Sequence, residues 1–333
     1  GDRHRLKIFR EQLIKKELKM ESKSIECTNI EKWKDTLAGC IRCGYCFEHC
    51  PLVKHTGWES DSPRARLIMI YGLLTGELVP SEYVAEKVFS CFYCKRCEVA
   101  CSSGVPLTDI FTDAKKDLVA AGYSGPGTTS VTGKNCALCL ACISACPHDA
   151  RSYANNKIIV NPAACQGCGI CVETCPAGAI RIENTYGTSR PELSGTIREF
   201  FKENDTAKAI VFACNWSYYP DLQASRLEDH EMHEKDYKIL VNMCGGRLDI
   251  PLLLEPFLNR AKGIMVACCP EGECPHEGNV KAARLIRSMQ NLLTSMDIDP
   301  DRIKLVEIAP GDKSAFQAEI DQFMEEMTTR EPI

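Results

Sequence analysis

Long hydrophobic runs are absent from this sequence. The longest apolar stretches, such as LIMIYGLL at 67–74, are far shorter than the roughly 20 residues that a membrane-spanning helix needs. A strong basic excess is absent as well, because the net charge is −5, so the composition gives no reason to expect binding to nucleic acid. We therefore expect a cytoplasmic protein with no membrane span and no nucleic-acid partner.

Motifs for nucleotide binding and for hydrolysis are also missing. No G-x-G-x-x-G follows an expected strand and no P-loop occurs, which leaves no predicted site for a flavin, a nicotinamide or ATP. We find no Ser/His/Asp or paired-carboxylate constellation. No catalytic residue is therefore assigned, and the sequence leaves open whether the chain is itself an enzyme.

Cysteine, in contrast, is abundant, with 22 residues in a chain of 333. In a secreted protein this would suggest disulfides, but disulfide-rich domains are small and lack tight cysteine clusters at metal-ligand spacing. Most of the cysteines form four runs with the spacing C-x2-C-x2-C-x3-C, which begin at Cys40, Cys91, Cys136 and Cys165. This spacing favours metal binding.

Each run is suited to an iron–sulfur cluster. Three thiolates spaced three residues apart can hold one cluster, while the fourth cysteine ligates the neighbouring cluster, as in two-cluster ferredoxins. Zinc is the alternative, but it prefers two separated C-x2-C pairs. We predict four [4Fe–4S] sites: a first of Cys40, Cys43, Cys46 and Cys101, a second of Cys91, Cys94, Cys97 and Cys50, a third of Cys136, Cys139, Cys142 and Cys175, and a fourth of Cys165, Cys168, Cys171 and Cys146.

The first two runs are joined by a segment with helical character. Ser62 followed by Pro63 is an expected helix start, a cap with proline in the first turn. Apolar residues then recur at helical spacing over 67–74, and Val84 and Val88 repeat the pattern in a second segment. We therefore expect a mostly helical two-cluster domain.

The last two runs are much closer together. The segment 147–164 between them contains an Asn-Asn turn before the β-branched run KIIV, and a matching short strand, AIRIE, follows the fourth run. Pro147 and Pro176 directly follow the fourth cysteines. This pattern is typical of the compact bacterial ferredoxin with two clusters.

The last third alternates short strands with helical segments, which predicts a parallel sheet. The expected strands AKAIVFAC, YKILVNMC and GIMVACC each end on cysteine, IKLVEIA is the fourth strand, and a helix is expected over 279–298 with Leu285, Ile286, Met289, Leu292, Leu293 and Met296 on one face. Ligands of such sheets bind at the carboxyl ends of the strands. There Cys214, Cys244, Cys268, Cys269 and Cys274 should converge on a [2Fe–2S] cluster or, as the alternative, zinc.

These patterns define a multi-domain α+β chain. The expected parts are a basic N-terminal arm at 1–35, a helical ferredoxin domain at 36–120, a linker at 121–131, a bacterial-type ferredoxin domain at 132–184, a second linker at 185–206, and an α/β domain at 207–330. Cys27 is interpreted as a small buried side chain, and His49 and His148 either as tuning groups beside the clusters or as ordinary surface histidines.

Several stretches resemble known families. CIRCGYCFEHCP, SPRARL and CFYCKRCEVACSSGVP resemble the C subunit of heterodisulfide reductase, and the second domain resembles the ferredoxin insert of the A subunit of that enzyme. CNW, CGGRLDIPLLLEPF, CPEGEC and EGNVKAARL resemble the delta subunit of methyl-viologen-reducing hydrogenase. That family carries a [2Fe–2S] cluster and joins an electron-donating enzyme to a flavoprotein.

The sequence departs from these families at three places. Ser102 follows Cys101 where proline is usual, Ser217 stands where the delta family has the second cysteine of C-N-W-C, and Cys268 replaces the glycine before Cys269. The resemblance therefore implies Cys214, Cys244, Cys269 and Cys274 as [2Fe–2S] ligands, with Cys268 as the substitute candidate.

The resemblance implies an electron-transfer subunit with four [4Fe–4S] clusters and one [2Fe–2S] cluster. Its expected partners are a flavin-containing protein like the A subunit of heterodisulfide reductase, and a hydrogenase, a formate dehydrogenase or another reductase. The setting would be an electron-bifurcating or confurcating complex of an anaerobe. Two alternatives remain open: a catalytic reductase that reduces its substrate at the ACC cysteines, and a zinc-binding interaction protein.

Overall fold

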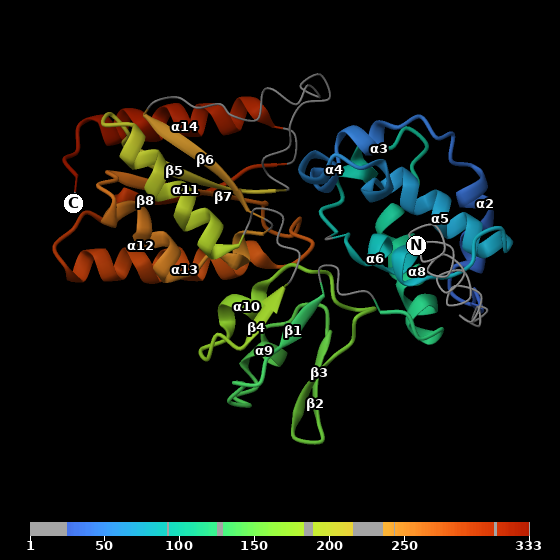
Figure 1. The fold of residues 1–333 in the computed structure, drawn as a ribbon. Helices are drawn as coiled ribbons and strands as arrows, with labels where there is room; N and C mark the ends of the chain where they lie inside the picture. Colours follow the sequence, from blue (N-terminus) through green and yellow to red (C-terminus); the bar gives the residue numbers. More distant parts are fainter. Residues whose placement is uncertain are drawn as a thin grey trace, which may run out of the picture.

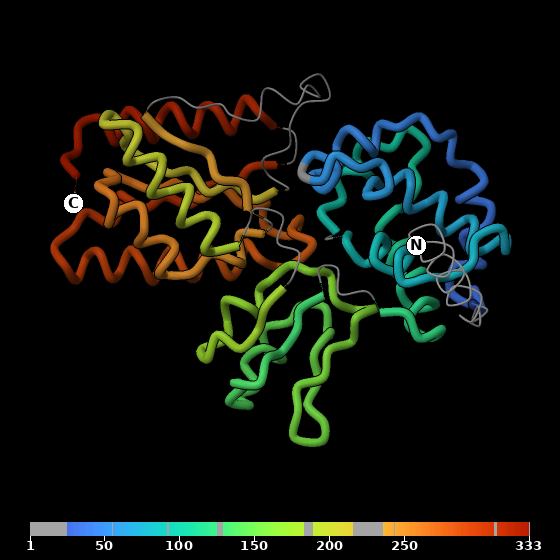
Figure 2. The backbone as a smooth tube through the Cα atoms, in the orientation of Figure 1, coloured from blue at the N-terminus to red at the C-terminus, as the bar shows by residue number. Residues whose placement is uncertain are grey.

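The structure, a computed structural model, describes residues 25–91, 93–124, 129–182, 189–215, 236–242, 244–309 and 312–332. The chain passes from a helical body through a small body with two short sheets to a larger sheet covered by helices (Figures 1 and 2). Most of the N-terminal arm lies outside the described residues. None of the described helices is both long and apolar enough to cross a membrane.

The first body is helical, as predicted. Ser62 caps its longest early helix, since Ser62 Oγ accepts a hydrogen bond from Ala65 N at 3.0 Å and Pro63 opens the first turn. Ile70, Val88 and Phe111, from three different helices, are fully buried in one core. The helices are α2 (Lys34–Ala38), α3 (Tyr45–Glu48), α4 (Pro51–Thr56), α5 (Pro63–Thr75), α6 (Glu82–Phe89), α7 (Arg96–Val99) and α8 (Leu107–Ala120).

The second body contains two antiparallel strand pairs and the short helices α9 (Ala141–Ser144) and α10 (Ile170–Thr174). KIIV forms β3 (Lys157–Val160), which pairs with β2 (Arg151–Ala154) across Asn155 and Asn156, both with positive φ. AIRIE forms β4 (Ile180–Ile182), but it pairs with β1 (Ser130–Thr132) rather than with β3. The body thus takes in the end of the segment expected to be a linker.

The C-terminal body is built on the predicted four-stranded parallel sheet. Its strands are β5 (Ala209–Cys214), β6 (Tyr237–Asn242), β7 (Gly263–Cys268) and β8 (Ile303–Glu307), in the order β6-β5-β7-β8. All three neighbouring pairs are parallel. Every side chain of β5 and β7 is buried, as expected for central strands that are covered on both faces.

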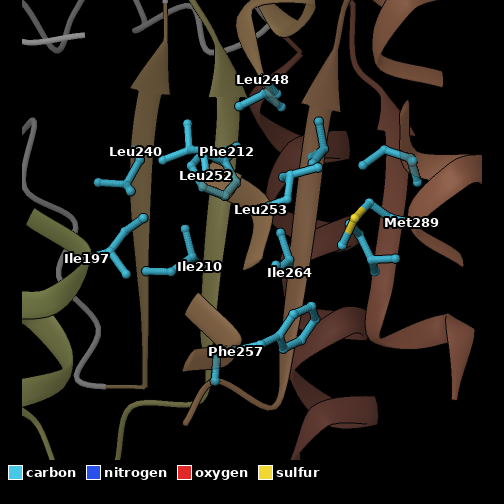
Figure 3. Packing of buried hydrophobic residues seen from close by; sticks show 14 of the residues in the cluster. Ile197, Ile210, Phe212, Leu240, Leu248, Leu252, Leu253, Phe257, Ile264 and Met289 are labelled. Atoms are coloured by element: carbon cyan, nitrogen blue, oxygen red, sulfur yellow. The ribbon is translucent and has the colours of Figure 1, made fainter. Parts of the chain in front are cut away.

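Helices cover the two faces of this sheet unequally. One face carries Ile210, Phe212 and Ile264, which pack against α11 (Arg190–Glu203), α12 (Ile250–Leu258) and α13 (Gly278–Ser295) (Figure 3). The other face carries Val211 and Met265, which pack against α14 (Lys313–Thr328). The alternation of neighbouring residues between the faces follows from the two-residue period of a strand.

Two expectations for this region need correction. Helix α11 occupies most of the segment 185–206 that composition alone assigns to a linker; it begins with a capping box formed by Ser189 and Glu192 and packs on the sheet. On α13 the buried face is centred on Ile286 and Met289, whereas Leu292 and Met296 are 38% and 59% exposed. Met296 has left the helix, so it no longer follows its period.

Candidate metal centres

All four cysteine runs share one backbone conformation. In every run, the residue before the second cysteine and the residue after it have left-handed, positive φ values. These pairs are Arg42 and Gly44, Tyr93 and Lys95, Leu138 and Leu140, and Gly167 and Gly169. Backbone turns of this kind point successive N–H groups into a concavity that binds anions, including iron–sulfur groups. The loops are therefore shaped to surround a negatively charged group.

The amides of these loops do face cysteine sulfur atoms. The backbone N–H of Tyr45 lowers the pKa of the exposed Cys43 thiol. Burial raises the pKa of Cys94 and Cys168 to about 12, and the backbone N–H groups of Arg96 and Ile170 act against that rise. Hydrogen bonds from amides favour the thiolate, which is the form that binds metal.

The second predicted site is a cavity lined by all four of its cysteines. Cys50 comes from the first run and meets Cys91, Cys94 and Cys97 around this small cavity. Arg66, only 1% exposed, lies beside them and donates hydrogen bonds to Lys87 O at 2.6 Å and Ser90 Oγ at 3.1 Å. Burial lowers the pKa of Arg66, but the thiolates of Cys91 and Cys50 raise it above its usual value.

The fourth predicted site has the same organisation. Cys146 from the third run meets Cys165, Cys168 and Cys171 around a small cavity. Arg151 is 4% exposed and donates to Thr132 Oγ1 at 3.0 Å and Ser130 Oγ at 2.8 Å. The thiolates of Cys171 and Cys142 raise its pKa against the effect of burial. A buried arginine thus accompanies each of these two sites.

The first and third predicted sites lie closer to solvent. Burial raises the pKa of Cys46 to about 12, and the nearby thiolates of Cys40, Cys101 and Cys43 add to the rise, so these four sulfur atoms are neighbours. In the third site Cys142 and Cys175 share a small core with Ile180. Beside the same site, Asn135, which directly precedes Cys136, donates a hydrogen bond from Nδ2 to Ala177 O at 3.1 Å. Cys43 and Cys139 are exposed.

The fifth predicted site lies at the carboxyl edge of the parallel sheet. Cys214 Sγ is 3.7 Å from Cys269 Sγ, and both residues are buried. Hydrogen bonds from the Cys244 and Cys269 thiols hold the pKa of the Cys274 thiol far below its usual value. Four sulfur atoms therefore gather where three strands end, a donor set that suits a [2Fe–2S] cluster or zinc.

Cys268 lies beside these four cysteines but points into the core: burial raises the pKa of its thiol, and the thiolates of Cys214 and Cys274 add to that rise. It belongs to the hydrophobic core under α12 and α13, and its sulfur faces Gly245, where an added β-carbon would collide with it. Ser217 lies outside the described residues. Gly278 has a matching role beside Cys244 Sγ, since a β-carbon there would also collide with sulfur.

Backbone N–H groups bind the sulfur of the last cysteine in four motifs. The donor is always four residues further on: Val105 to Cys101 at 3.4 Å, Ala150 to Cys146 at 3.4 Å, Ala179 to Cys175 at 3.2 Å, and Gly278 to Cys274 at 3.2 Å. Gly278 is the first residue of α13, so the positive end of that helix dipole points at Cys274. At Cys50, in contrast, Lys54 N binds the carbonyl oxygen.

Two single residues from the sequence analysis also have defined places. Cys27 Sγ donates to Leu73 O at 3.5 Å beside the helical core, apart from the five sites. His148 Nε2 lies 2.9 Å from His276 Nδ1, in a hydrogen bond between the second and C-terminal bodies. Sequence reasoning did not single out His276, although it stands two residues after Cys274 just as His148 stands two residues after Cys146.

Known families match all three bodies of the chain. The methyl-viologen-reducing hydrogenase delta subunit matches residues 209–329, and 4Fe-4S dicluster domains match residues 36–105 and 128–186. The iron-sulfur D subunit of the F420-non-reducing hydrogenase of Archaeoglobus profundus is 30% identical over 117 residues, which cover 34% of this chain and 83% of the relative. The chain belongs to this delta-subunit family. The resemblance recognised in the sequence is confirmed.

Other relatives match part of this delta-subunit family member. The A subunit of the ferredoxin/F(420)H(2)-dependent CoB-CoM heterodisulfide reductase of Methanosarcina acetivorans is 28% identical over 205 residues, or 52% of this chain, but the match spans only 25% of that relative. The glycolate oxidase iron-sulfur subunit of Escherichia coli is 30% identical over 113 residues, 34% of this chain and 26% of the relative. The chain is thus an iron–sulfur electron-transfer protein with [4Fe–4S] dicluster domains.

Proposed function

We propose that the chain carries four [4Fe–4S] clusters and one [2Fe–2S] cluster and relays electrons within a heterodisulfide-reductase-type complex. One partner would be a flavoprotein like the A subunit of heterodisulfide reductase, and the other a hydrogenase, a formate dehydrogenase or another reductase. The complex would bifurcate or confurcate electrons at the flavin of that partner. The families of the relatives, which name heterodisulfide reductase and hydrogenase subunits, support these partners.

The observation that carries the proposal is the gathering of cysteines from distant runs. Cys50 lies with the second run and Cys146 with the fourth, as shared ligation between neighbouring clusters requires. The proposed ligands are the five sets given above, with Cys214, Cys244, Cys269 and Cys274 at the fifth site. Cys268 is left out because its sulfur faces Gly245 in the hydrophobic core.

Bound at these sites, the clusters accept and release one electron at a time. The chain controls how favourable that is through the charge around each site. Arg66 and Arg151 place positive charge beside the second and fourth sites, and the N–H groups of Val105, Ala150, Ala179 and Gly278 donate to ligand sulfur. Both features stabilise the reduced state because reduction adds negative charge.

We propose three functional domains that follow the three bodies. The helical domain spans about 25–120 rather than 36–120, because Ile30 is fully buried in its core and Asn29 N donates to Asp117 of α8. The bacterial-type ferredoxin domain spans about 130–184, since β1 begins at Ser130. The C-terminal domain begins at Ser189, because α11 packs on its sheet, and ends near residue 330. The arm before residue 25 and the short connections would then serve assembly.

Metal analysis of anaerobically purified protein tests this proposal. We expect about 18 iron atoms per chain with an equal amount of acid-labile sulfide, which corresponds to four [4Fe–4S] clusters and one [2Fe–2S] cluster. Zinc in place of iron would overturn it in favour of an interaction protein. Copurification from the native host then identifies the partners, and turnover of a disulfide by the isolated chain would support a catalytic role instead.

A further inference from the structure

We propose that the chain is a branched conductor, in which the second, fourth and fifth sites meet at one junction of the three domains. This inference rests on the proposed clusters but not on the identity of the partners. A relay in chain order would lead from the first site to the fifth through the second, third and fourth. The structure instead joins the second, fourth and fifth sites pairwise by side chains that cross between domains.

Lys115 joins the second and fourth sites. It lies on α8 of the helical domain, is fully buried, and its Nζ donates to Cys165 O of the ferredoxin domain at 3.3 Å. The same Nζ lies 4.5 Å from the centre of the Tyr93 ring, and Tyr93 stands between Cys91 and Cys94. One side chain therefore contacts the ligand loops of two sites that belong to different domains.

Arg96 joins the second and fifth sites. It stands between Cys94 and Cys97, is 4% exposed, and its Nε donates to Asn215 O at 2.8 Å. Asn215 directly follows Cys214, the first proposed ligand of the fifth site. The Arg96 guanidinium donates a second hydrogen bond, from Nη2, to the same oxygen. The ligand loops of these two sites are thus hydrogen-bonded across the domain boundary.

His148 and His276 join the fourth and fifth sites. Their ring nitrogens are 2.9 Å apart, and the ligand atoms of His148, His276 and Cys168 all lie within 4.8 Å of one another. Cys168 is a proposed ligand of the fourth site, while His276 is two residues from Cys274 of the fifth. Lys281 of α13 adds a further contact, since its Nζ donates to Ile170 O at 3.2 Å.

The first and third sites lie outside these crossing contacts. Each has an exposed cysteine, Cys43 or Cys139, whereas every cysteine of the second and fourth sites is buried or partly buried. The rate of electron transfer falls steeply with distance, so the exposed sites suit exchange with partner proteins and the buried sites suit internal transfer. Each internal step oxidises one site and reduces its neighbour by one electron, without transfer of a proton or an atom. The electrons come from the redox partner or, in the test below, from dithionite.

Electron paramagnetic resonance of the full chain tests the junction. In the Cys43→Ser/Cys139→Ser variant we expect loss of the two exposed clusters and about ten iron atoms per chain, from two [4Fe–4S] clusters and one [2Fe–2S] cluster. After reduction with dithionite, the three remaining signals should still be broadened and split by mutual spin coupling. A relay in chain order predicts that loss of the third site uncouples the second site from the fourth.

Bridging variants test each contact. Lys115→Met should reduce the coupling between the second and fourth sites, and His276→Leu should reduce the coupling between the fourth and fifth, both at unchanged iron content. Lys116→Met is the matched control, because Lys116 is the next residue on α8 but is 49% exposed and pairs with Asp113. In Lys116→Met the coupling between the second and fourth sites should equal that of the unaltered protein.

Failure of the junction can be told from failure of the proposed function. Full iron content in the unaltered protein with no coupling among the second, fourth and fifth sites would overturn the junction alone. An iron content far below about 18 atoms per chain would show that the clusters are absent and would overturn both proposals. One zinc ion per chain that is lost in His276→Leu would assign His148, Cys168 and His276 to a zinc site and overturn the third contact.

Discussion

The two dicluster domains differ in fold but place their sites in the same way. The helical domain packs its sites against a core formed largely by α5, α6 and α8, while the second domain uses two strand pairs and a much smaller core. Each nevertheless has one site near solvent and one more buried site, with Arg66 beside the buried site of the first domain and Arg151 between the two sites of the second. The position of a site within the assembly, rather than the surrounding fold, therefore determines its burial.

Removal of a buried ligand should have the largest effect. Cys97→Ser removes a proposed ligand of the second site, so its cluster should be lost. Without metal, burial raises the pKa of the Cys91 thiol, and Arg66 and Lys115 lose the thiolate charge that offsets their own burial. Breaking a buried charge pair on one side costs about 3–5 kcal/mol. We expect a fall of that size in the free energy of unfolding, measured by anaerobic urea denaturation.

Cys43→Ser is the matched change at the exposed site. We expect this variant to stay folded and to lose about four iron atoms, because Cys43 faces solvent and carries no buried cation beside it in the described contacts. Equal destabilisation by the two variants would break the distinction between buried and exposed sites.

The next largest difference is expected between substitutions of the neighbouring residues Cys268, which ends β7, and Cys269, which follows it. Cys269→Ser removes a proposed ligand, so about two iron atoms and the [2Fe–2S] resonance should be lost. Cys268→Ser should retain both, since its sulfur faces Gly245 in the core. Iron analysis and electron paramagnetic resonance provide the measurement, and the reverse result would exchange the two residues in the ligand set.

Replacement of the buried arginine should shift a reduction potential. Arg66→Gln removes positive charge beside the second site, and a hydrogen bond to a charged group contributes about 1.5–3 kcal/mol. For one electron this corresponds to a potential lower by roughly 60–130 mV. Redox titration followed by electron paramagnetic resonance measures it, with Arg198→Gln as control, because Arg198 is 58% exposed and pairs with Glu255. A shift of equal size in the control would reject a local effect.

The smallest effect concerns the left-handed loop residues. Gly169 has φ +80° and its hydrogen faces the Arg247 side chain, so Gly169→Ala should destabilise the protein by about 1–2 kcal/mol. Leu140 has φ +64° and is 41% exposed, so Leu140→Gly should relieve strain and raise stability by up to about 1 kcal/mol. The urea midpoint measures both effects. If both variants shifted it in the same direction, the φ angle would not determine stability at these positions.

Much of this organisation follows from the sequence because it rests on local patterns. Ser62 with Pro63, the Asn155–Asn156 turn and the four C-terminal strands all form where their residues predict them. The capping box at Ser189 and Glu192 was an equally local signal for α11, but the polar, glycine-containing stretch around it favoured a linker. Spacing predicts the four [4Fe–4S] ligand sets and the family resemblance implies the fifth; the ligand sets and their metal content stay predictions.

The contacts between domains were not predictable in this way. In the sequence Lys115 is one of several lysines on an amphipathic helix, and only the folded structure brings it to Cys165, which is 50 residues away. Arg96 meets Asn215 over 119 residues and His148 meets His276 over 128. Such pairs have no periodicity to mark them. The glycines of two runs signalled left-handed turns, but Tyr93, Lys95, Leu138 and Leu140 adopt the same turns without that signal.

The burial of Lys115 links metal loading to domain assembly. An ammonium group moved out of water needs negative charge nearby, and the opposite charges beside Lys115 are the thiolates of Cys91 and Cys165. Before iron arrives, burial keeps the Cys91 thiol protonated by raising its pKa, so closure of the domains around the lysine is opposed. Once those sulfur atoms hold metal they are permanently deprotonated. We therefore expect the first two domains to dock only after both buried sites are loaded, and a chain lacking iron to keep them apart.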